Sequence, residues 1–484
     1  MSDSTNALSY AVRLPILGRY LSQLALMLAL LNLVPLAVSI ALAEYAFSLR
    51  YGMVVITLAL IAIPGLRQPE PQQLQANEAI VIVSLAFLLT PLVMTFPMSA
   101  GSLPLEDALF EAVSAVTTTG LSTTGSVEGR SPMLLFSRSW MQWYGGLGIA
   151  VLSVALLMGQ HAAARRLAEP TEADNIATTA RRQARQVLEA YAALTLVGGV
   201  LLWAVLGEPM IAATHILSTV STGGFSTYDS SLAGLPLPAA WLLTLFSLFG
   251  AIPLLLYFQA MRGRAQELWR DPEVRALLLA VLAMTTLLGL TLHANMGMAW
   301  EHALQHGLML GASAQTTTGF ASLPVEELDD TSKLLMICSM LIGGGSGSTA
   351  GGFKLLRLLV LLRLLQYFLR RTAMPPHAVV QPRLSGRILK SIEVERMVLV
   401  IALFVAISGL SWLAFLAYGY APLDALFEVV SATGTVGLST GISRPELETP
   451  LKLLLCVNML LGRLEVLALL VLLYPRTWIG KRAP

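Results

Sequence analysis

The sequence is poor in charged residues, which make up only 12% of its 484 positions. A soluble domain usually carries about 25% of them. Together with 55% hydrophobic residues, this deficit excludes an ordinary soluble protein. Apolar runs close to the ~20 residues that span a bilayer recur along the chain, and no stretch between them could hold a sizeable soluble domain. We therefore expect an all-α polytopic membrane protein.

Cysteine is equally scarce, with Cys338 and Cys456 as the two examples. Both lie in apolar helical runs, where we expect small core residues rather than a disulfide or a metal site. The sequence also lacks a Ser–His, paired-Asp or His-Glu-x-x-His constellation, so we predict no enzyme. His302 and His306 lie one turn apart but lack further ligands, and we expect them at an interface or in the core. The first residues lack a signal-peptide cleavage pattern, so the first apolar run is expected to be retained.

Basic and acidic residues alternate between the apolar runs. Acidic residues gather at Glu326, Glu327, Asp329 and Asp330, for example. By the positive-inside rule the basic segments should face the cytoplasm and the acidic segments the outside. The basic residues are Arg165, Arg166, Arg181, Arg182 and Arg185, then Arg262 and Arg264, then Lys354, Arg357, Arg363, Arg370, Arg371, Arg383, Arg387 and Lys390.

A short Thr/Gly phrase occurs four times. Each copy has a glycine in the fourth place and a serine six residues before that glycine, and each follows an apolar segment too short to cross a bilayer. Such a length suits a re-entrant helix. The copies occupy 117–123, 221–227, 316–322 and 434–440, and the short segments lie near 105–117, 209–221, 300–316 and 421–433.

These segments define a repeated organisation. Two helices come first, near 15–43 and 49–66, followed by a Pro-rich link from Arg67 to Pro71. Four units should follow, each with a full span, a short pore helix, a Thr/Gly loop and a closing span, arranged around a central pore. We expect full spans near 78–97, 186–207, 274–295 and 393–418, and closing spans near 133–159, 238–261, 332–370 and 449–475. The predicted boundaries are 1–70 for the N-terminal helices and 71–165, 166–265, 266–385 and 386–484 for the four units.

Four such loops around one axis could replace the hydration shell of a potassium ion with backbone carbonyls. Glycine suits them because it adopts backbone angles closed to other residues, and the C-terminal dipole of each short helix would favour a cation. Small-residue helix packing could explain one copy, but four copies favour a selectivity filter. The predicted filter residues are Thr118, Thr119, Gly120, Thr222, Gly223, Gly224, Thr317, Thr318, Gly319, Thr435, Val436 and Gly437.

Beyond the loops, three stretches resemble the Trk/Ktr/HKT superfamily of cation transporters, TrkH type. They are 138–149 (RSWMQWYGGLGI), 343–354 (GGGSGSTAGGFK) and 461–466 (LGRLEV). The resemblance implies K⁺ uptake through a multi-pass protein of the bacterial inner membrane, with both termini in the cytoplasm. It implies a homodimer in the lipid bilayer and a TrkA-like cytoplasmic ring of nucleotide-binding regulatory subunits. K⁺ would be the transported ion, with no covalent cofactor and no nucleic-acid partner.

In this superfamily a serine in place of the first filter glycine accompanies sodium transport, and four glycines accompany potassium transport. All four are glycine here, so potassium is favoured. Ala321 stands where the other loops have serine, and Gly434-Thr-Val436 replaces the triple threonine. These departures predict modest selectivity over sodium.

The resemblance also implies that the glycine-rich stretch is an intramembrane gating loop below the filter. It partly fits nucleotide-binding patterns, but no strand precedes it and Phe353 stands where a phosphate loop has lysine. Lys354 would anchor its end, Arg463 would raise the barrier to cations, and Glu465 would pair with a neighbouring helix. The predicted gate residues are Gly343, Gly344, Gly345, Ser346, Gly347, Ser348, Thr349, Gly351, Gly352, Lys354 and Arg463.

Glu111 and Glu428 occupy equivalent positions of the first and fourth short segments, where His215 and Leu310 stand in the others. We expect the two carboxylates to brace their loops rather than to bind the ion. A sodium- or proton-coupled symporter stays open as the alternative function. It would need acidic residues near the middle of the membrane, and only Glu111, Glu428 and Glu465 fit that description.

Overall fold

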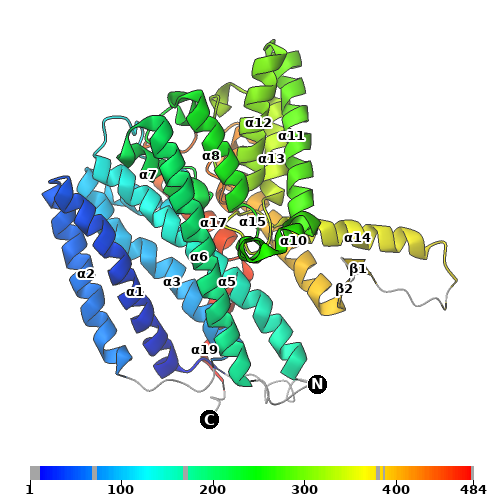
Figure 1. The fold of residues 1–484 in the computed structure, drawn as a ribbon, viewed down its shortest axis with the longest axis horizontal. Helices are drawn as coiled ribbons and strands as arrows, with labels where there is room; N and C mark the ends of the chain where they lie inside the picture. Colours follow the sequence, from blue (N-terminus) through cyan, green and yellow to red (C-terminus); the bar gives the residue numbers. More distant parts are fainter. Residues whose placement is uncertain are drawn as a thin grey trace.

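The computed structural model describes residues 11–67, 74–166, 173–375, 377, 382–384 and 387–480, without the side chains of 66, 76, 153–181 and 387. Helices make up nearly all of it (Figure 1). Six described helices are long and apolar enough to cross a membrane, or up to eight if each bent pair is one span. This confirms the prediction of a polytopic all-α protein. The link after Arg67 and the side chains of Arg165, Arg166 and Arg181 lie outside the described residues.

The six long apolar helices are α1 (Leu14–Ala41), α2 (Tyr45–Leu66), α3 (Ala76–Met98), α6 (Ala173–Leu206), α11 (Pro272–Met296) and α15 (Ser391–Ala417). The short helices before the Thr/Gly loops are α4 (Leu105–Val116), α7 (Pro209–Val220), α12 (Trp300–Thr316) and α16 (Pro422–Thr433). The helices after those loops are α5 (Pro132–Arg166), α8 (Leu237–Gly250), α13 (Asp330–Ile342) and α17 (Thr449–Arg463). The remaining elements are α9 (Leu254–Gln259), α10 (Ala265–Arg270), α14 (Leu355–Arg371), α18 (Leu467–Leu473), α19 (Pro475–Trp478), a hairpin of β1 (Arg383–Leu384) and β2 (Arg387–Ile388), and the single turns η1 (Ser99–Gly101), η3 (Ser231–Gly234), η4 (Ala260–Arg264) and η5 (Val325–Glu327).

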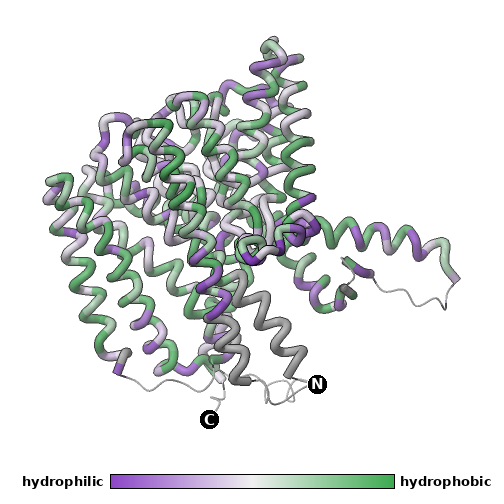
Figure 2. Tube along the Cα trace, in the orientation of Figure 1, coloured by the Kyte–Doolittle hydropathy of each residue, from purple (hydrophilic) through white to green (hydrophobic). Residues whose placement is uncertain are grey.

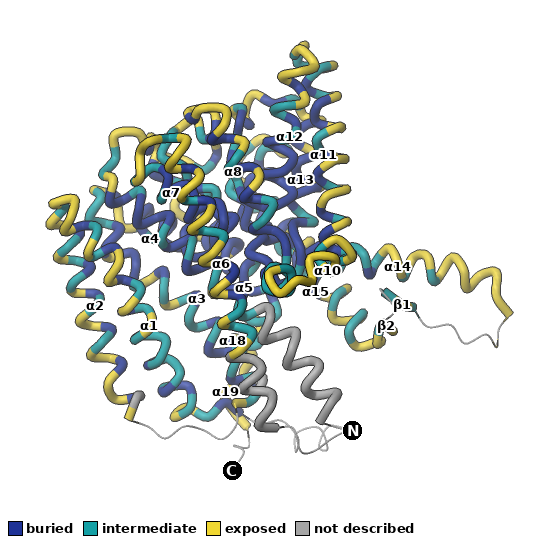
Figure 3. Tube along the Cα trace, viewed as in Figure 1, coloured by how far each residue is buried: buried dark blue, intermediate teal, exposed yellow. Residues whose placement is uncertain are grey.

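Each short helix packs against the long helix before it and the helix after it. The Thr/Gly loops and the C-terminal halves of the short helices are largely buried, while the long helices are rich in hydrophobic residues, many of them exposed (Figures 2 and 3). Leu196 and Leu410 are about 70% and 69% exposed on such faces. An outer surface of this kind requires lipid rather than water, because a soluble protein rarely exposes large apolar patches.

Three of the four predicted closing spans are not continuous helices. α8 and α9 meet at 94° and α17 and α18 at 108°, while the stretch 343–354 separates α13 from α14, which projects sideways (Figure 1). The first bend falls at Pro253, which has no N–H for a helical hydrogen bond. The last falls at Glu465 and Val466, whose φ angles of 53° and 58° are left-handed. The predicted closing spans 238–261 and 449–475 are therefore bent helix pairs and not straight helices.

Two buried lysines connect consecutive short-helix regions through ion pairs, one with a buried aspartate and one with a half-buried aspartate. Lys452 Nζ of α17 lies 2.6 Å from Asp107 Oδ1 of α4, and Lys333 Nζ of α13 lies 2.9 Å from Asp424 Oδ1 of α16. Both aspartates lie in the first turn of their helix, where the positive end of the helix dipole also favours them. These pairs hold α17 to α4 and α13 to α16.

One expectation about the cysteines was wrong. Cys456 is buried as expected, but Cys338 is exposed, because α13 turns it outward on the same face as Leu334. His306 is half-buried and bonds Ser322 Oγ through Nδ1 at 3.1 Å, whereas His302 is exposed. The expected core position is therefore confirmed for Cys456 and wrong for Cys338.

Candidate functional site: a ring of four loops

The four Thr/Gly loops meet in a closed ring, which we call the loop ring. A Cβ added to Gly120 would collide with the Gly223 carbonyl, and one added to Gly224 with the Thr318 carbonyl. The same holds between Gly319 and the Val436 carbonyl, and between Gly437 and the Thr119 carbonyl. Each loop therefore approaches the next so closely that only glycine fits, and the last loop returns to the first. The ring unites all the predicted filter residues.

Each loop turns through a threonine in the left-handed region. Thr118, Thr222, Thr317 and Thr435 have φ angles of 53°, 52°, 54° and 49°. A β-branched residue rarely adopts such angles, and each costs on the order of 1–3 kcal/mol. The next amide compensates by donating to the carbonyl of the serine at the end of the short helix, for example Thr119 N–H to Ser114 O at 2.8 Å.

The loops differ in how their glycine amides are held. Gly120 N–H donates to Ser114 Oγ at 3.0 Å and Gly437 N–H to Ser431 Oγ at 3.1 Å. The equivalent hydroxyls of Ser218 and Ser313 are buried without a hydrogen-bond partner among the described residues. The first and fourth loops are therefore tied more firmly than the second and third.

Glu111 and Glu428 brace their loops, as expected. Glu111 Oε1 accepts hydrogen bonds from Ser122 Oγ at 2.7 Å and Thr123 N at 2.8 Å. Glu428 accepts from Ser439 Oγ at 3.0 Å, Thr440 N at 3.1 Å and Ser443 N at 3.1 Å. Both carboxylates are fully buried and engaged behind the loops.

In the second loop a histidine takes the place of the bracing glutamate, and the third loop has neither residue. His215 Nε2 lies 3.1 Å from Ser226 Oγ. In the third loop both positions are apolar, Leu310 and Ala321. The Ala321 amide donates instead to Ser231 Oγ at 3.1 Å, so the third loop is held by the segment that follows the second.

Sequence reasoning gave no role to two polar side chains of α5 that contact the second loop. Gln142 Nε2 donates to the Gly223 carbonyl at 2.6 Å. Arg138 Nε lies 2.8 Å from Glu111 Oε2, and its guanidinium carbon lies 3.8 Å from the centre of the Phe225 ring. The available signal was their spacing, since i and i+4 share one face of an otherwise apolar helix.

The glycine-rich stretch between α13 and α14 contacts the C-terminal ends of three short helices. Gly351 N–H donates to Thr317 Oγ1 at 2.6 Å and Gly352 N–H to Gly434 O at 3.0 Å. Thr349 Oγ1 donates to Val220 O at 3.0 Å. The structure thus places the predicted gate residues 343–352 directly against one end of the loop ring.

Charged side chains of Arg463, Lys354 and Glu273 form hydrogen bonds with this stretch. Arg463 Nη1 donates to Thr349 O at 2.8 Å, while Lys354 Nζ donates to Ala350 O. Arg463 and Lys354 are 3% and 6% exposed, so two cations are buried beside the loop. Glu465 forms an ion pair with Arg357 of α14, which confirms the expected contact with a neighbouring helix.

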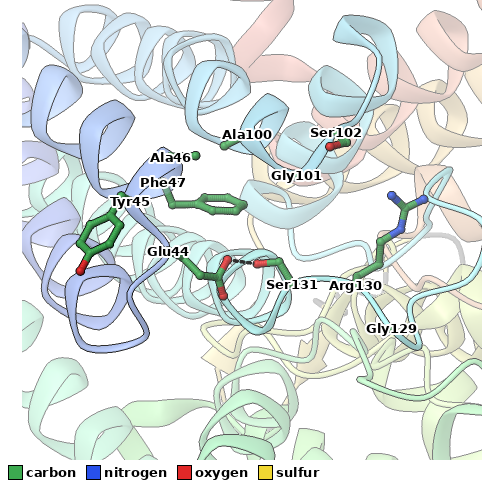
Figure 4. A pocket seen from close by; sticks show the side chains of 10 residues that line it. All are labelled: Glu44, Tyr45, Ala46, Phe47, Ala100, Gly101, Ser102, Gly129, Arg130 and Ser131. Atoms are coloured by element: carbon green, nitrogen blue, oxygen red, sulfur yellow. Dashed lines mark hydrogen bonds between the residues drawn. The ribbon is translucent and has the colours of Figure 1, made fainter.

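An outer cavity of about 400 Å³ lies elsewhere, between the α1–α2 connection and the start of α5 (Figure 4). Its Glu44 carboxylate accepts hydrogen bonds from the Ser131 hydroxyl and from Met133 N–H, the latter at 3.1 Å. These bonds cap α5, and no residue of the loop ring lines the cavity. Within the described ranges, no three His, Cys, Asp or Glu side chains come together as a metal site would require.

The chain is similar to known proteins of one family. The TrkH family, described as a cation transport protein, matches residues 51–477. The Trk system potassium uptake protein TrkI of Halomonas elongata is 32% identical, covering 96% of this chain and 96% of the relative. TrkH of Salmonella typhimurium is 29% identical, covering 84% of this chain and 87% of the relative.

The crystal structure of the potassium transporter TrkH from Vibrio parahaemolyticus matches with a TM-score of 0.85 at 26% identity, covering 97% of this chain and 100% of that chain. The resemblance predicted from the sequence is thereby confirmed, as is the expectation of a transporter rather than an enzyme. This chain belongs to the TrkH family of cation transport proteins.

Proposed function

We propose that this protein takes up potassium across the bacterial inner membrane, and that the loop ring is its selectivity filter. The fold would then consist of four pseudo-repeated helix–pore helix–helix units around a central pore, with α1 and α2 added at the N-terminus. The observation that carries the proposal is the closure of the ring by Gly120, Gly224, Gly319 and Gly437. Relatives named as potassium uptake proteins support the choice of ion.

The physical argument begins with dehydration. A K⁺ ion entering a narrow filter exchanges its water for backbone carbonyls. Left-handed threonines followed by glycines fix the carbonyls at each loop, and the short helices direct the negative ends of their dipoles toward the same place. Irregular backbone at membrane depth is tolerated only where protein buries it or water lines it, which favours a pore through the ring.

The stretch 343–352 would act as the gate. Its hydrogen bonds to Val220, Thr317 and Gly434 hold it against one end of the ring. Six of its residues are glycine, so its backbone can change conformation readily. Arg463, buried beside it, would repel cations while the loop is in place.

The proposal includes an assembly and an orientation. Val12 N–H donates to Thr477 O at 2.9 Å, so both ends of the described chain lie on one side, which we propose to be the cytoplasm. The basic residues of α14 would form a docking surface for nucleotide-binding regulatory subunits. A homodimer, as the resemblance implies, would carry two pores.

The decisive experiment is Gly120→Ser, with K⁺ and Na⁺ uptake measured side by side in purified protein in liposomes. A serine side chain at this position would enter the space of the Gly223 carbonyl, so the K⁺/Na⁺ uptake ratio should fall. An unchanged ratio in a correctly folded variant would refute the filter assignment. K⁺ flux that requires a sodium or proton gradient would instead support the symporter.

A further inference from the structure

The second filter loop differs from the others at the residue before its conserved glycine. That position holds Thr119, Thr318 and Val436 in the first, third and fourth loops, but Gly223 in the second. A Cβ added to Gly223 would collide with the side-chain amide of Gln142, coming within 2.6 Å of its Nε2. Gln142 of α5 therefore occupies the space that the side chain takes in the other loops.

Gln142 also binds the backbone of this loop. Its Nε2 donates to the Gly223 carbonyl at 2.6 Å, and its Oε1 accepts from Phe225 N–H at 3.4 Å. The side chain is fully buried. In the part of the chain that the structure describes, no hydrogen bond reaches the corresponding carbonyls of Thr119, Thr318 or Val436. One carbonyl of the ring thus has a donor that the other three lack.

α5 holds this contact rigidly. Arg138 lies one helical turn before Gln142, pairs with Glu111 behind the first loop at 2.8 Å, and covers the Phe225 ring of the second loop. Both side chains are at most 2% exposed. One face of α5 therefore bridges the first and second loops, and the Gln142 amide has little freedom to withdraw.

We infer that Gln142 is a positioning residue of the filter that raises its preference for K⁺ over Na⁺, an inference that rests on the filter function proposed above. The amide restrains the Gly223 carbonyl, so this oxygen cannot move inward to fit the smaller Na⁺. The donated hydrogen bond also draws electron density from the oxygen and weakens its field. A weaker field disfavours Na⁺ more than K⁺, because Na⁺ needs more compensation for its lost water. Both the restraint of the carbonyl and its weaker field therefore favour K⁺ over Na⁺.

The first test replaces Gln142 with Leu or Met, which keep its approximate size and have no hydrogen-bond donor. The K⁺/Na⁺ uptake ratio in liposomes should fall about three- to tenfold, the range for one hydrogen bond. The ratio is measured within one preparation, so a loss of folded protein cancels. Ser139→Ala is the matched control, since Ser139 is buried one residue from Arg138 and its hydroxyl has no described partner; its ratio should not change.

The second test uses the steric coupling between Gln142 and Gly223. Gly223→Ala alone should lower the ratio because the new methyl group displaces the amide. Adding Gly223→Ala to Gln142→Ala should cause no further loss, because the amide is already gone. Additive losses in the double variant would overturn the inference, as would a wild-type ratio in both Gln142→Leu and Gln142→Met.

Gly120→Ser separates this inference from the proposed function. If Gly120→Ser lowers the ratio and the Gln142 variants do not, the filter assignment holds and the role of Gln142 is refuted. If Gly120→Ser leaves the ratio unchanged, the filter assignment fails and the inference fails with it.

Discussion

Glu111→Gln and Glu428→Gln form a matched pair that should differ sharply in stability. Both glutamates are fully buried and brace equivalent loops. Glu111 also forms the buried ion pair with Arg138 at 2.8 Å, while Glu428 forms no ion pair among the described residues. Neutralising Glu111 leaves a buried guanidinium without its carboxylate, which costs about 3–5 kcal/mol.

Neutralising Glu428 weakens only hydrogen bonds to a charged acceptor, at about 1.5–3 kcal/mol. The difference between the two variants should therefore be on the order of 2 kcal/mol. The assay is the unfolding free energy of detergent-purified protein, followed by the intrinsic fluorescence of its tryptophans. Adding Arg138→Gln to Glu111→Gln should recover part of the loss, because the unpaired charge is removed. Equal losses in the two single variants, or additive losses in the double variant, would refute this reasoning.

Three further outcomes follow from contacts described above. Asp329→Ala removes the N-cap of α13 and should lower the unfolding free energy by about 1 kcal/mol. Burial raises the pKa of Asp329, but hydrogen bonds from Ser332, Asn295 and Thr331 outweigh this effect, so the pKa is lowered. The stabilisation by the ionised Asp329 carboxylate is present above pH ~4 and is lost as the pH falls through the pKa of Asp329 in the folded protein. An acid titration should therefore destabilise the wild type more than the variant. Arg463→Ala removes a buried cation and its hydrogen bond to the gate stretch, so K⁺ uptake in liposomes should become faster, and a slower rate in folded protein would contradict the gating role. Lys452→Met leaves Asp107 buried and unpaired at a cost of about 3–5 kcal/mol, and a second change, Asp107→Asn, should restore part of the unfolding free energy.

The sequence predicted best what is repeated. Four short apolar segments and four Thr/Gly phrases located the buried helices and the loops within a few residues, because each feature has a length or a backbone requirement of its own. The bends were harder. Pro253 gave a local signal for one of them, but no proline or glycine lies between Gly462 and Pro475, where the chain breaks at Glu465 and Val466.

Side-chain contacts between residues far apart in the sequence could not be predicted, for a different reason. The spacing of Arg138 and Gln142 shows that they share a helix face, but nothing local indicates what that face meets. The Gly223 carbonyl that Gln142 binds is 81 residues away. Cys338 was wrongly expected in the core, because its apolar sequence neighbours do not show whether its helix face contacts protein or lipid.

The closure of the loop ring has a consequence for how this chain is made. The first loop contacts Gly437 of the last loop. Lys452 likewise binds Asp107, which lies 345 residues away in the sequence. During synthesis, the first three loops must therefore enter the membrane with one side of the ring open and its polar backbone unprotected. A ribosome that stalls before the fourth loop would release a product with an exposed polar seam, which membrane quality-control proteases could recognise.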